Sequence, residues 1–197
     1  ASDRRIRELR GRSVAYVFQD PLSTLHPLFT VGDQLREAIT AHHPLSKAST
    51  NERAVELLSL VRIPNPKERL SAYPHELSGG MRQRVCIAMA LANDAKVLIA
   101  DEPTTALDVT VQSQILTLMN GLRRERDAAI LFITHDIVMA RHFCDRLVVM
   151  RDGRAVEAGT ADEVALRPRH PYTRALIAAV EETASLPREA FERLAAE

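Results

Sequence analysis

The chain has 197 residues, of which 46% are hydrophobic and 26% charged, a composition typical of a globular protein. Lys and Arg together number 26, as do Asp and Glu, so no overall positive field argues for a nucleic-acid partner. No uninterrupted apolar run approaches the about 18 residues that a membrane-spanning helix needs. The two cysteines, Cys86 and Cys144, match no metal-binding spacing, which fits a reducing compartment.

The first half of the chain is predicted to form one strand followed by helices. The apolar, β-rich run 13–18 predicts a buried strand, which Pro21 ends. Apolar spacing then predicts helices over 31–43, 51–63 and 81–94. Ser49, with Glu52 three residues later, predicts a capping box for the second of these helices.

The second half alternates strands with helices. Strands are predicted over 96–103 and 128–136, with an amphipathic helix over 109–127 between them. A hairpin over 145–159 turns at Asp152-Gly153, and helices follow from Thr160 and from Pro171. Since 28–92 is all helical in this prediction, we expect an α/β core with a helical insertion after its first strand.

Polar side chains follow three of the predicted strands. Gln19 follows the first strand, Asp101 and Glu102 end the second, and His135 ends the third. Each alone is more often a turn or solvated residue. Ligands of open α/β sheets, however, gather beyond the carboxyl ends of the strands. Together the four side chains fit a nucleotide site, in which an aspartate holds Mg²⁺, a second carboxylate polarises water and a histidine contacts phosphate.

Ser78, Gly79 and Gly80 directly precede a basic helix. Their backbone N–H groups and the positive end of the helix favour an anion, most often a phosphate. A loose turn between two helices is the alternative explanation for the glycine pair.

Four motifs in order along the chain resemble those of the ATP-binding-cassette (ABC) ATPases. They are "VFQDP" (17–21), "LSGGMRQR" (77–84), "VLIADEPTTALD" (97–108) and "FITHD" (132–136), similar to the Q-loop, signature, Walker B with D-loop, and switch-histidine motifs. The resemblance covers essentially the whole chain.

This resemblance implies an α/β fold with a P-loop NTPase, RecA-like core. The implied parts are the Q-loop part of the core (1–27), an all-helical signature subdomain (28–92), the core from Walker B to the switch histidine (93–160) and a C-terminal helical extension (161–197).

The resemblance also implies roles for the strand-end residues, with ATP and Mg²⁺ as ligands. Asp101 would support Mg²⁺, and Glu102 would act as general base toward the attacking water. His135 would contact the γ-phosphate, and Gln19 would reach both metal and water.

Two further sites are implied to act between subunits. In the family two ATPase subunits, identical or homologous, sandwich ATP head to tail. Ser78, Gly79 and Gly80 would close over the ATP held by the second subunit, and Asp108 would lie in a loop that faces it.

A phosphate loop of the form G-x-x-x-x-G-K-[ST] is missing from the 197 residues, because no lysine directly follows any of the seven glycines. We therefore expect a fragment that lacks the amino-terminal portion of the core, the Walker A portion. A natural half-protein is the alternative. Loss of that portion would expose an apolar sheet edge.

Four longer stretches narrow the resemblance to the importer ATPases for di- and oligopeptides and nickel. They are "VFQDPLSTLHPLFTVGDQL", "YPHELSGGMRQRVCIAMALA", "IADEPTTALDVTVQSQIL" and "HPYTRAL". This branch implies a peripheral ATPase at the cytoplasmic face of the cell membrane, bound to two transmembrane permease subunits through 28–92 and the Gln19 loop. A solute-binding protein would deliver the solute. A non-transport ABC protein of translation or DNA repair, or a non-hydrolysing interaction half, remain alternatives.

Overall fold

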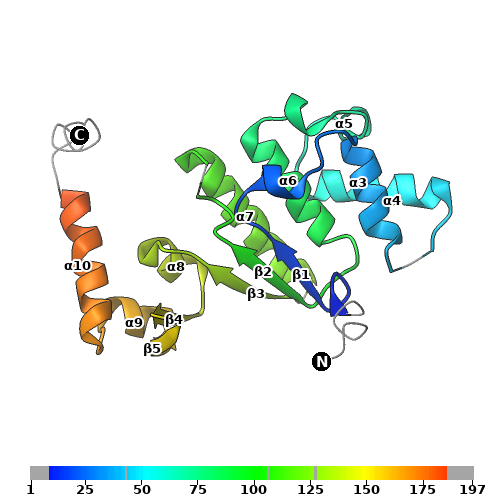
Figure 1. Cartoon of the computed structure of the whole chain (residues 1–197). Helices are drawn as coiled ribbons and strands as arrows, with labels where there is room; N and C mark the ends of the chain where they lie inside the picture. The colour runs from blue at the N-terminus through cyan, green and yellow to red at the C-terminus, as the bar shows by residue number, and fades with distance from the viewer. Residues whose placement is uncertain (1–8, 43, 106, 127, 186–197) are drawn as a thin grey trace. The chain divides into compact units, whose positions relative to one another are not determined.

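The computed structural model describes residues 9–42, 44–105, 107–126 and 128–185 (Figure 1). The chain divides into two compact units, Ala1–Ile133 and Thr134–Glu197. Five parts of the predicted motifs and segments lie outside the described residues: 1–8, His43 and Asp127 at the ends of two predicted helices, Ala106 of the D-loop motif, and 186–197 of the C-terminal extension.

A parallel three-stranded sheet forms the centre of the first unit. Its strands are β1 (Val14–Val17), β2 (Val97–Asp101) and β3 (Ala129–Ile133), in the order β1-β2-β3. Val17 pairs with Ala100 and Ala100 with Phe132, so the carboxyl ends of all three strands meet at one edge. This register brings the side chains that follow β1 and β2 together, as the strand pattern predicted.

The connection from β1 to β2 consists, in its described residues, of helices and loops. The helices are α2 (Pro21–Thr24), α3 (Val31–Thr40), α4 (Lys47–Leu60), α5 (Pro66–Arg69), a 3₁₀ turn (Pro74–Glu76) and α6 (Gly79–Ala90). In Figure 1, α3 to α6 gather beside the sheet. Their apolar faces bury Leu35, Leu57, Leu58 and Ile87. The helical insertion expected from the sequence is present.

The return from β2 to β3 passes through α7 (Val109–Arg126). Ile115, Leu118 and Leu122 are buried on its predicted apolar face, and Met119 joins them. A helix that follows one parallel strand and leads to the next is the usual crossover of an α/β sheet.

The predicted capping box at Ser49 and Glu52 is wrong. Ser46 is the N-cap of α4, and its hydroxyl oxygen accepts a hydrogen bond from the Ser49 backbone N–H at 3.2 Å. Thr50 also donates through its hydroxyl to the Ser46 carbonyl at 2.9 Å. Both serines suit an N-cap by type, but the earlier one lets the helix begin about one turn sooner.

The second unit is built around an antiparallel hairpin. It contains α8 (Ile137–Phe143), β4 (Arg146–Arg151), β5 (Arg154–Thr160), α9 (Ala161–Leu166) and α10 (Pro171–Ser185). Asp152 and Gly153 take φ angles of 50° and 74°, the left-handed pair that a two-residue hairpin turn favours. Thr160 is the N-cap of α9, as predicted, and it forms a capping box with Glu163.

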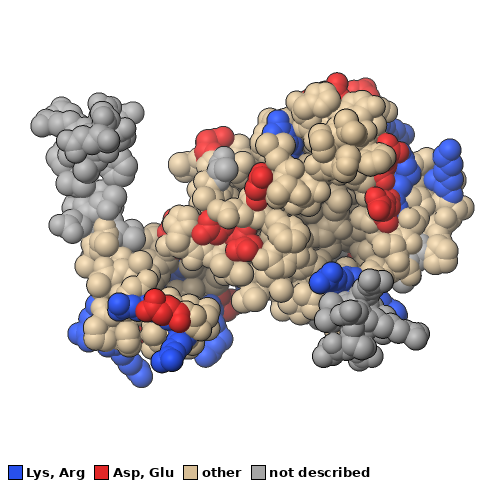
Figure 2. Space-filling model, viewed as in Figure 1, with Lys and Arg blue, Asp and Glu red and all other residues tan. Residues whose placement is uncertain are grey.

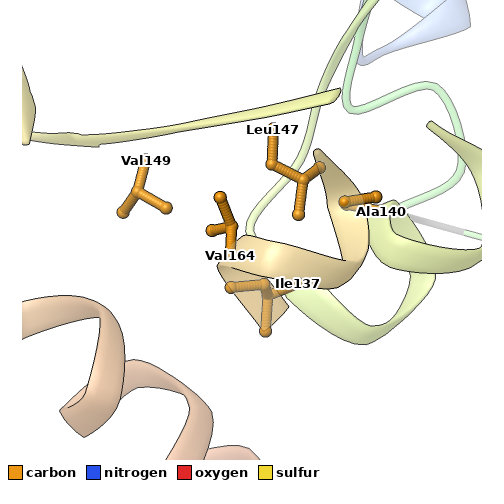
Figure 3. Close-up of a cluster of buried hydrophobic side chains, with 6 residues drawn as sticks. Ile137, Ala140, Leu147, Val149 and Val164 are labelled. Atoms are coloured by element: carbon orange, nitrogen blue, oxygen red, sulfur yellow. The ribbon is translucent and has the colours of Figure 1, made fainter. Parts of the chain in front are cut away.

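A small apolar core holds this second unit together (Figure 3). Ile137 and Ala140 of α8 and Val164 of α9 pack against Leu147 and Val149 of β4, and all five are buried. Burying apolar side chains of this size stabilises a fold by about 1.5–3 kcal/mol each for Val, Leu or Ile. The buried residues that alternate with exposed ones along β4 therefore face the apolar side chains of α8 and α9.

Charged side chains of both signs are interspersed on the face that Figure 2 draws, over the helices of the first unit and over the hairpin of the second. This distribution agrees with the equal numbers of acidic and basic residues. Among the described helices, none combines the length and apolarity needed to cross a bilayer.

Candidate active site

Gln19 and Glu102 meet at the carboxyl edge of the sheet. Gln19 lies two residues beyond β1, and Glu102 directly follows β2. The Gln19 amide nitrogen Nε2 donates to Glu102 Oε2 at 2.8 Å. The structure thus joins two of the residues that the sequence singled out, from segments 83 positions apart.

The backbone of Glu102 is held in an unusual conformation. Its φ angle is 43°, in the left-handed region that a residue with a side chain adopts at a cost of about 1–3 kcal/mol. The Glu102 N–H donates to the Ile133 carbonyl at 2.9 Å, and the Thr105 hydroxyl donates to Glu102 Oε2 at 3.0 Å. These contacts fix both the backbone and the carboxylate, and such strain concentrates at functional sites.

Asp101 at the end of β2 is oriented by a tyrosine. The Tyr16 hydroxyl donates to Asp101 Oδ2 at 2.6 Å. This hydrogen bond raises the pKa of Tyr16, because a phenolate would lose the bond and face the negative carboxylate. Tyr16 pairs with Ile99 in the parallel register, so it shares a face with Asp101 two residues further on.

The Ser78–Gly80 segment opens α6. Ser78 is the N-cap, and its hydroxyl oxygen accepts a hydrogen bond from the Met81 N–H at 3.3 Å. The Arg82 Nε donates to the carbonyls of Pro74 and Leu77 at 2.9 and 3.0 Å, which fixes the loop that leads to the helix. The twelve residues of α6 are long enough to carry a positive end, as the anion prediction requires.

Asp108 stands at the start of α7. Its Oδ1 accepts a hydrogen bond from the Val111 N–H at 2.9 Å, and its carbonyl accepts from the Gln112 N–H at 2.8 Å. The carboxylate therefore caps the helix that follows the Asp101–Glu102 segment. This cap is a structural role, and a role toward a partner subunit remains a prediction.

His135 belongs to the second unit. It lies between β3 and Asp136, the N-cap of α8, whose Oδ1 accepts from the Met139 N–H at 2.8 Å. The structure therefore groups Gln19, Asp101 and Glu102 within the first unit and assigns the histidine to the second.

Tyr16 and Thr105 contact the two carboxylates and were not predicted from the sequence. Tyr16 lies inside an apolar run, whose pattern alone predicts a buried strand and no polar contact for the tyrosine. Its contact with Asp101 follows from the two-residue periodicity of the strands once the pairing of β1 with β2 is known. Thr105 lies three residues after Glu102, a spacing at which a hydroxyl in a turn reaches back.

The oxygen atoms at the sheet edge suit Mg²⁺. This ion is usually held by one or two carboxylates, substrate phosphates and water rather than by a full protein cage. Asp101 and Glu102 supply two carboxylates, and within the described part of the chain no group of three or more His, Cys, Asp or Glu side chains forms a cage of its own. The residues present fit a nucleotide-bound metal.

Comparison with known proteins identifies the family of the chain. The family model described as "ABC transporter" matches residues 1–105. The oligopeptide transport ATP-binding protein OppD of Bacillus subtilis (strain 168) is 51% identical over 179 residues, 91% of this chain and 50% of that protein. The dipeptide transport ATP-binding protein DppD of the same organism is 48% identical over 179 residues, 91% of this chain and 53% of that protein. The chain thus spans about half the length of the curated relatives it matches.

A solved structure has the same fold. The dimeric post-hydrolysis state of the ATP-binding cassette MJ0796, bound to ADP and Pi, matches with a TM-score of 0.72 and 30% identity over 82% of this chain and 68% of that one. The predicted fold class, a P-loop NTPase of the ABC type, is confirmed. By its motifs, its fold and the matching family model, this chain belongs to the ABC transporter family.

Proposed function

We propose that the chain is part of the ATP-binding and ATP-hydrolysing subunit of an importer that takes up di- or oligopeptides, or nickel, across the cytoplasmic membrane, and that these 197 residues lack the Walker A loop of that subunit. The observation that carries the proposal is the placement of Gln19, Asp101 and Glu102 at one sheet edge, with Glu102 held by two side-chain donors. The names of the relatives favour peptides over nickel as the solute.

In the proposed reaction, Glu102 takes the proton of the attacking water. The carboxylate is suited to this role because Gln19 and Thr105 both donate to Oε2, which fixes its orientation before substrate arrives. Bound ATP with Mg²⁺ would supply the phosphoryl group and neutralise its charge. Asp101 would hold the metal in the orientation that Tyr16 imposes on it.

The remaining site residues would contact the γ-phosphate of ATP or a second ATPase subunit. We assign His135 to the γ-phosphate, and Ser78, Gly79 and Gly80 to the phosphates of ATP bound by a second ATPase subunit. Asp108 would face that subunit. The open helix end of α6, which begins at Gly79, supports the anion role.

The proposed partners are a second ABC ATPase subunit, identical or homologous, and two permease subunits contacted by the helical insertion and the Gln19 loop. ATP-driven closure of the dimer and its reset by hydrolysis would shift the permease between conformations. A solute-binding protein would deliver the solute, so this chain would not touch it.

The transport role is tested by removing the gene and measuring uptake of labelled di- and oligopeptides and of nickel by the cells. We expect loss of uptake of one class of solute, restored by the wild-type gene, and co-purification of the tagged protein with two membrane subunits. Normal uptake together with association with ribosomes or DNA-repair proteins would contradict the transport proposal.

A second prediction concerns the 197-residue chain itself. Because it contains no G-x-x-x-x-G-K-[ST] loop, we expect no binding of ATP at micromolar concentrations in a calorimetric titration. The full-length protein, titrated in parallel, should bind in that range. Micromolar binding of ATP by the monomeric 197-residue chain would show that the phosphate loop is not needed for its own site.

A further inference from the structure

The two glycines that open α6 have different surroundings. A Cβ atom built on Gly79 would meet only Leu107 Cδ2, at 3.8 Å, an ordinary contact. A Cβ atom built on Gly80 would lie 2.5 Å from Val111 Cγ1, closer than real side-chain atoms approach. Gly80 is therefore required by packing within the chain, whereas an atom added at Gly79 would make only an ordinary contact with Leu107.

Val111 is poorly able to yield to an added side chain. It lies in the first turn of α7, where its N–H donates to Asp108 Oδ1 at 2.9 Å. Its branched Cβ also restricts the side chain to essentially one rotamer in a helix. The contact between Gly80 and Val111 is therefore a close approach of two helices at a fixed point.

A second contact joins the same two helices about one turn further on. The Arg84 Nη2 of α6 donates to Gln114 Oε1 of α7 at 2.7 Å, and Arg84 Nη1 donates to the Val61 carbonyl at 3.2 Å. The helices α6 and α7 are therefore joined at two points about one turn apart. The start of α7 is tied in turn to Glu102 through the bonds Thr105 N–H to Glu102 O (3.3 Å) and Leu107 N–H to Thr104 O (3.1 Å).

We propose that Val111 is a positioning residue that, through its contact with Gly80, fixes the Ser78–Gly80 helix tip to the segment carrying Glu102 and Asp108. When the tip closes over a partner's nucleotide, it then moves together with Glu102, the chain's own general base. The role of Val111 in closure rests on the proposed function, whereas its packing against Gly80 is independent of that function.

Substitution at the contact gives the test, made in the full-length protein with Glu102→Gln as the parent so that ATP-bound dimers accumulate. Gly80→Ala should lower the thermal midpoint without nucleotide by roughly 2–12 °C, as overpacking does in a domain of this size. It should also weaken ATP-dependent dimerisation, measured by sedimentation, about tenfold or more. Adding Val111→Ala should restore both, because it removes both Cγ atoms of residue 111 and leaves its Cβ, which lies 3.7 Å away.

Gly79→Ala is the matched control. It should leave the thermal midpoint within about 2 °C of the parent, since its new methyl meets an ordinary contact. It should still weaken dimerisation, and Val111→Ala should not restore that loss. A Gly80→Ala protein as stable and as dimeric as the parent, or one that Val111→Ala fails to rescue, would overturn the inference. If the parent itself does not dimerise with ATP, the proposed function fails, while the rescue of the thermal midpoint still decides the packing.

Discussion

Replacing Glu102 by glutamine is expected to lower the ATPase rate of the full-length dimeric protein about 100-fold or more and to trap the dimer around ATP. Glutamine keeps the shape of the side chain and an oxygen for the donors Gln19 and Thr105, so the site should stay assembled. It cannot accept the proton of the attacking water, and general-base catalysis contributes about 10²–10⁴-fold. Steady-state phosphate release and sedimentation in ATP measure the two effects.

Glu52→Gln, on the exposed side of α4, is the matched control because it removes the same charge far along the chain from the strand ends. It should leave both hydrolysis and the monomer–dimer equilibrium within about twofold of wild type. Unchanged turnover in Glu102→Gln would remove Glu102 from its role as base. Slow turnover without a trapped dimer would instead point to failed assembly of the two subunits.

The strand ends were the most predictable part of the site. Short apolar runs that stop at polar residues fix where β1 and β2 end, and parallel pairing then brings Gln19 and Glu102 to the same edge. The helical insertion was predictable for a similar reason, since helical spacing of apolar residues recurs through it without a strand-like run. Apolar spacing along single segments therefore predicted the type and the order of these elements.

The contacts that hold the carboxylates were not predictable in this way. Tyr16 reaches Asp101 only because β1 and β2 pair in one particular register, which the sequence of either strand does not specify. The left-handed backbone of Glu102 likewise depends on its bond to Ile133 of the neighbouring strand. The N-cap of α4 failed for a different reason: Ser46 and Ser49 suit the position equally by type, and the chain uses the earlier one.

The glycine pair is another feature whose contacts the sequence alone does not specify. From the sequence, Gly79 and Gly80 both predict a backbone that closely approaches another group. In the structure Gly80 closely approaches Val111 of the same chain, whereas an atom added at Gly79 would meet only an ordinary contact with Leu107. Of the two, Gly79 is therefore the position where an added side chain would reach an external ligand without first disturbing the fold.

Gly79→Asp is accordingly expected to weaken ATP-dependent dimerisation and hydrolysis of the full-length protein about 100-fold or more. The new carboxylate would face the phosphates held by the other subunit, and two like charges 4 Å apart repel by about 4 kcal/mol at an effective dielectric of 20. Folding should not suffer, because an acidic residue in the first turn of a helix is favourable. Binding of ATP to the separate subunits, measured by calorimetry, should stay within about threefold of wild type, since this residue does not serve its own subunit's nucleotide.

Gly79→Asn separates charge from size. Asparagine has the shape of aspartate without its charge, so it should weaken dimerisation clearly less than Gly79→Asp does, and raising the salt concentration should narrow the gap. Equal losses in both variants would mean that the tip fails for lack of space and that no anion faces it. A loss of ATP binding by the separate subunits would place Gly79 in its own subunit's site, and the shared site between two subunits would then be wrong.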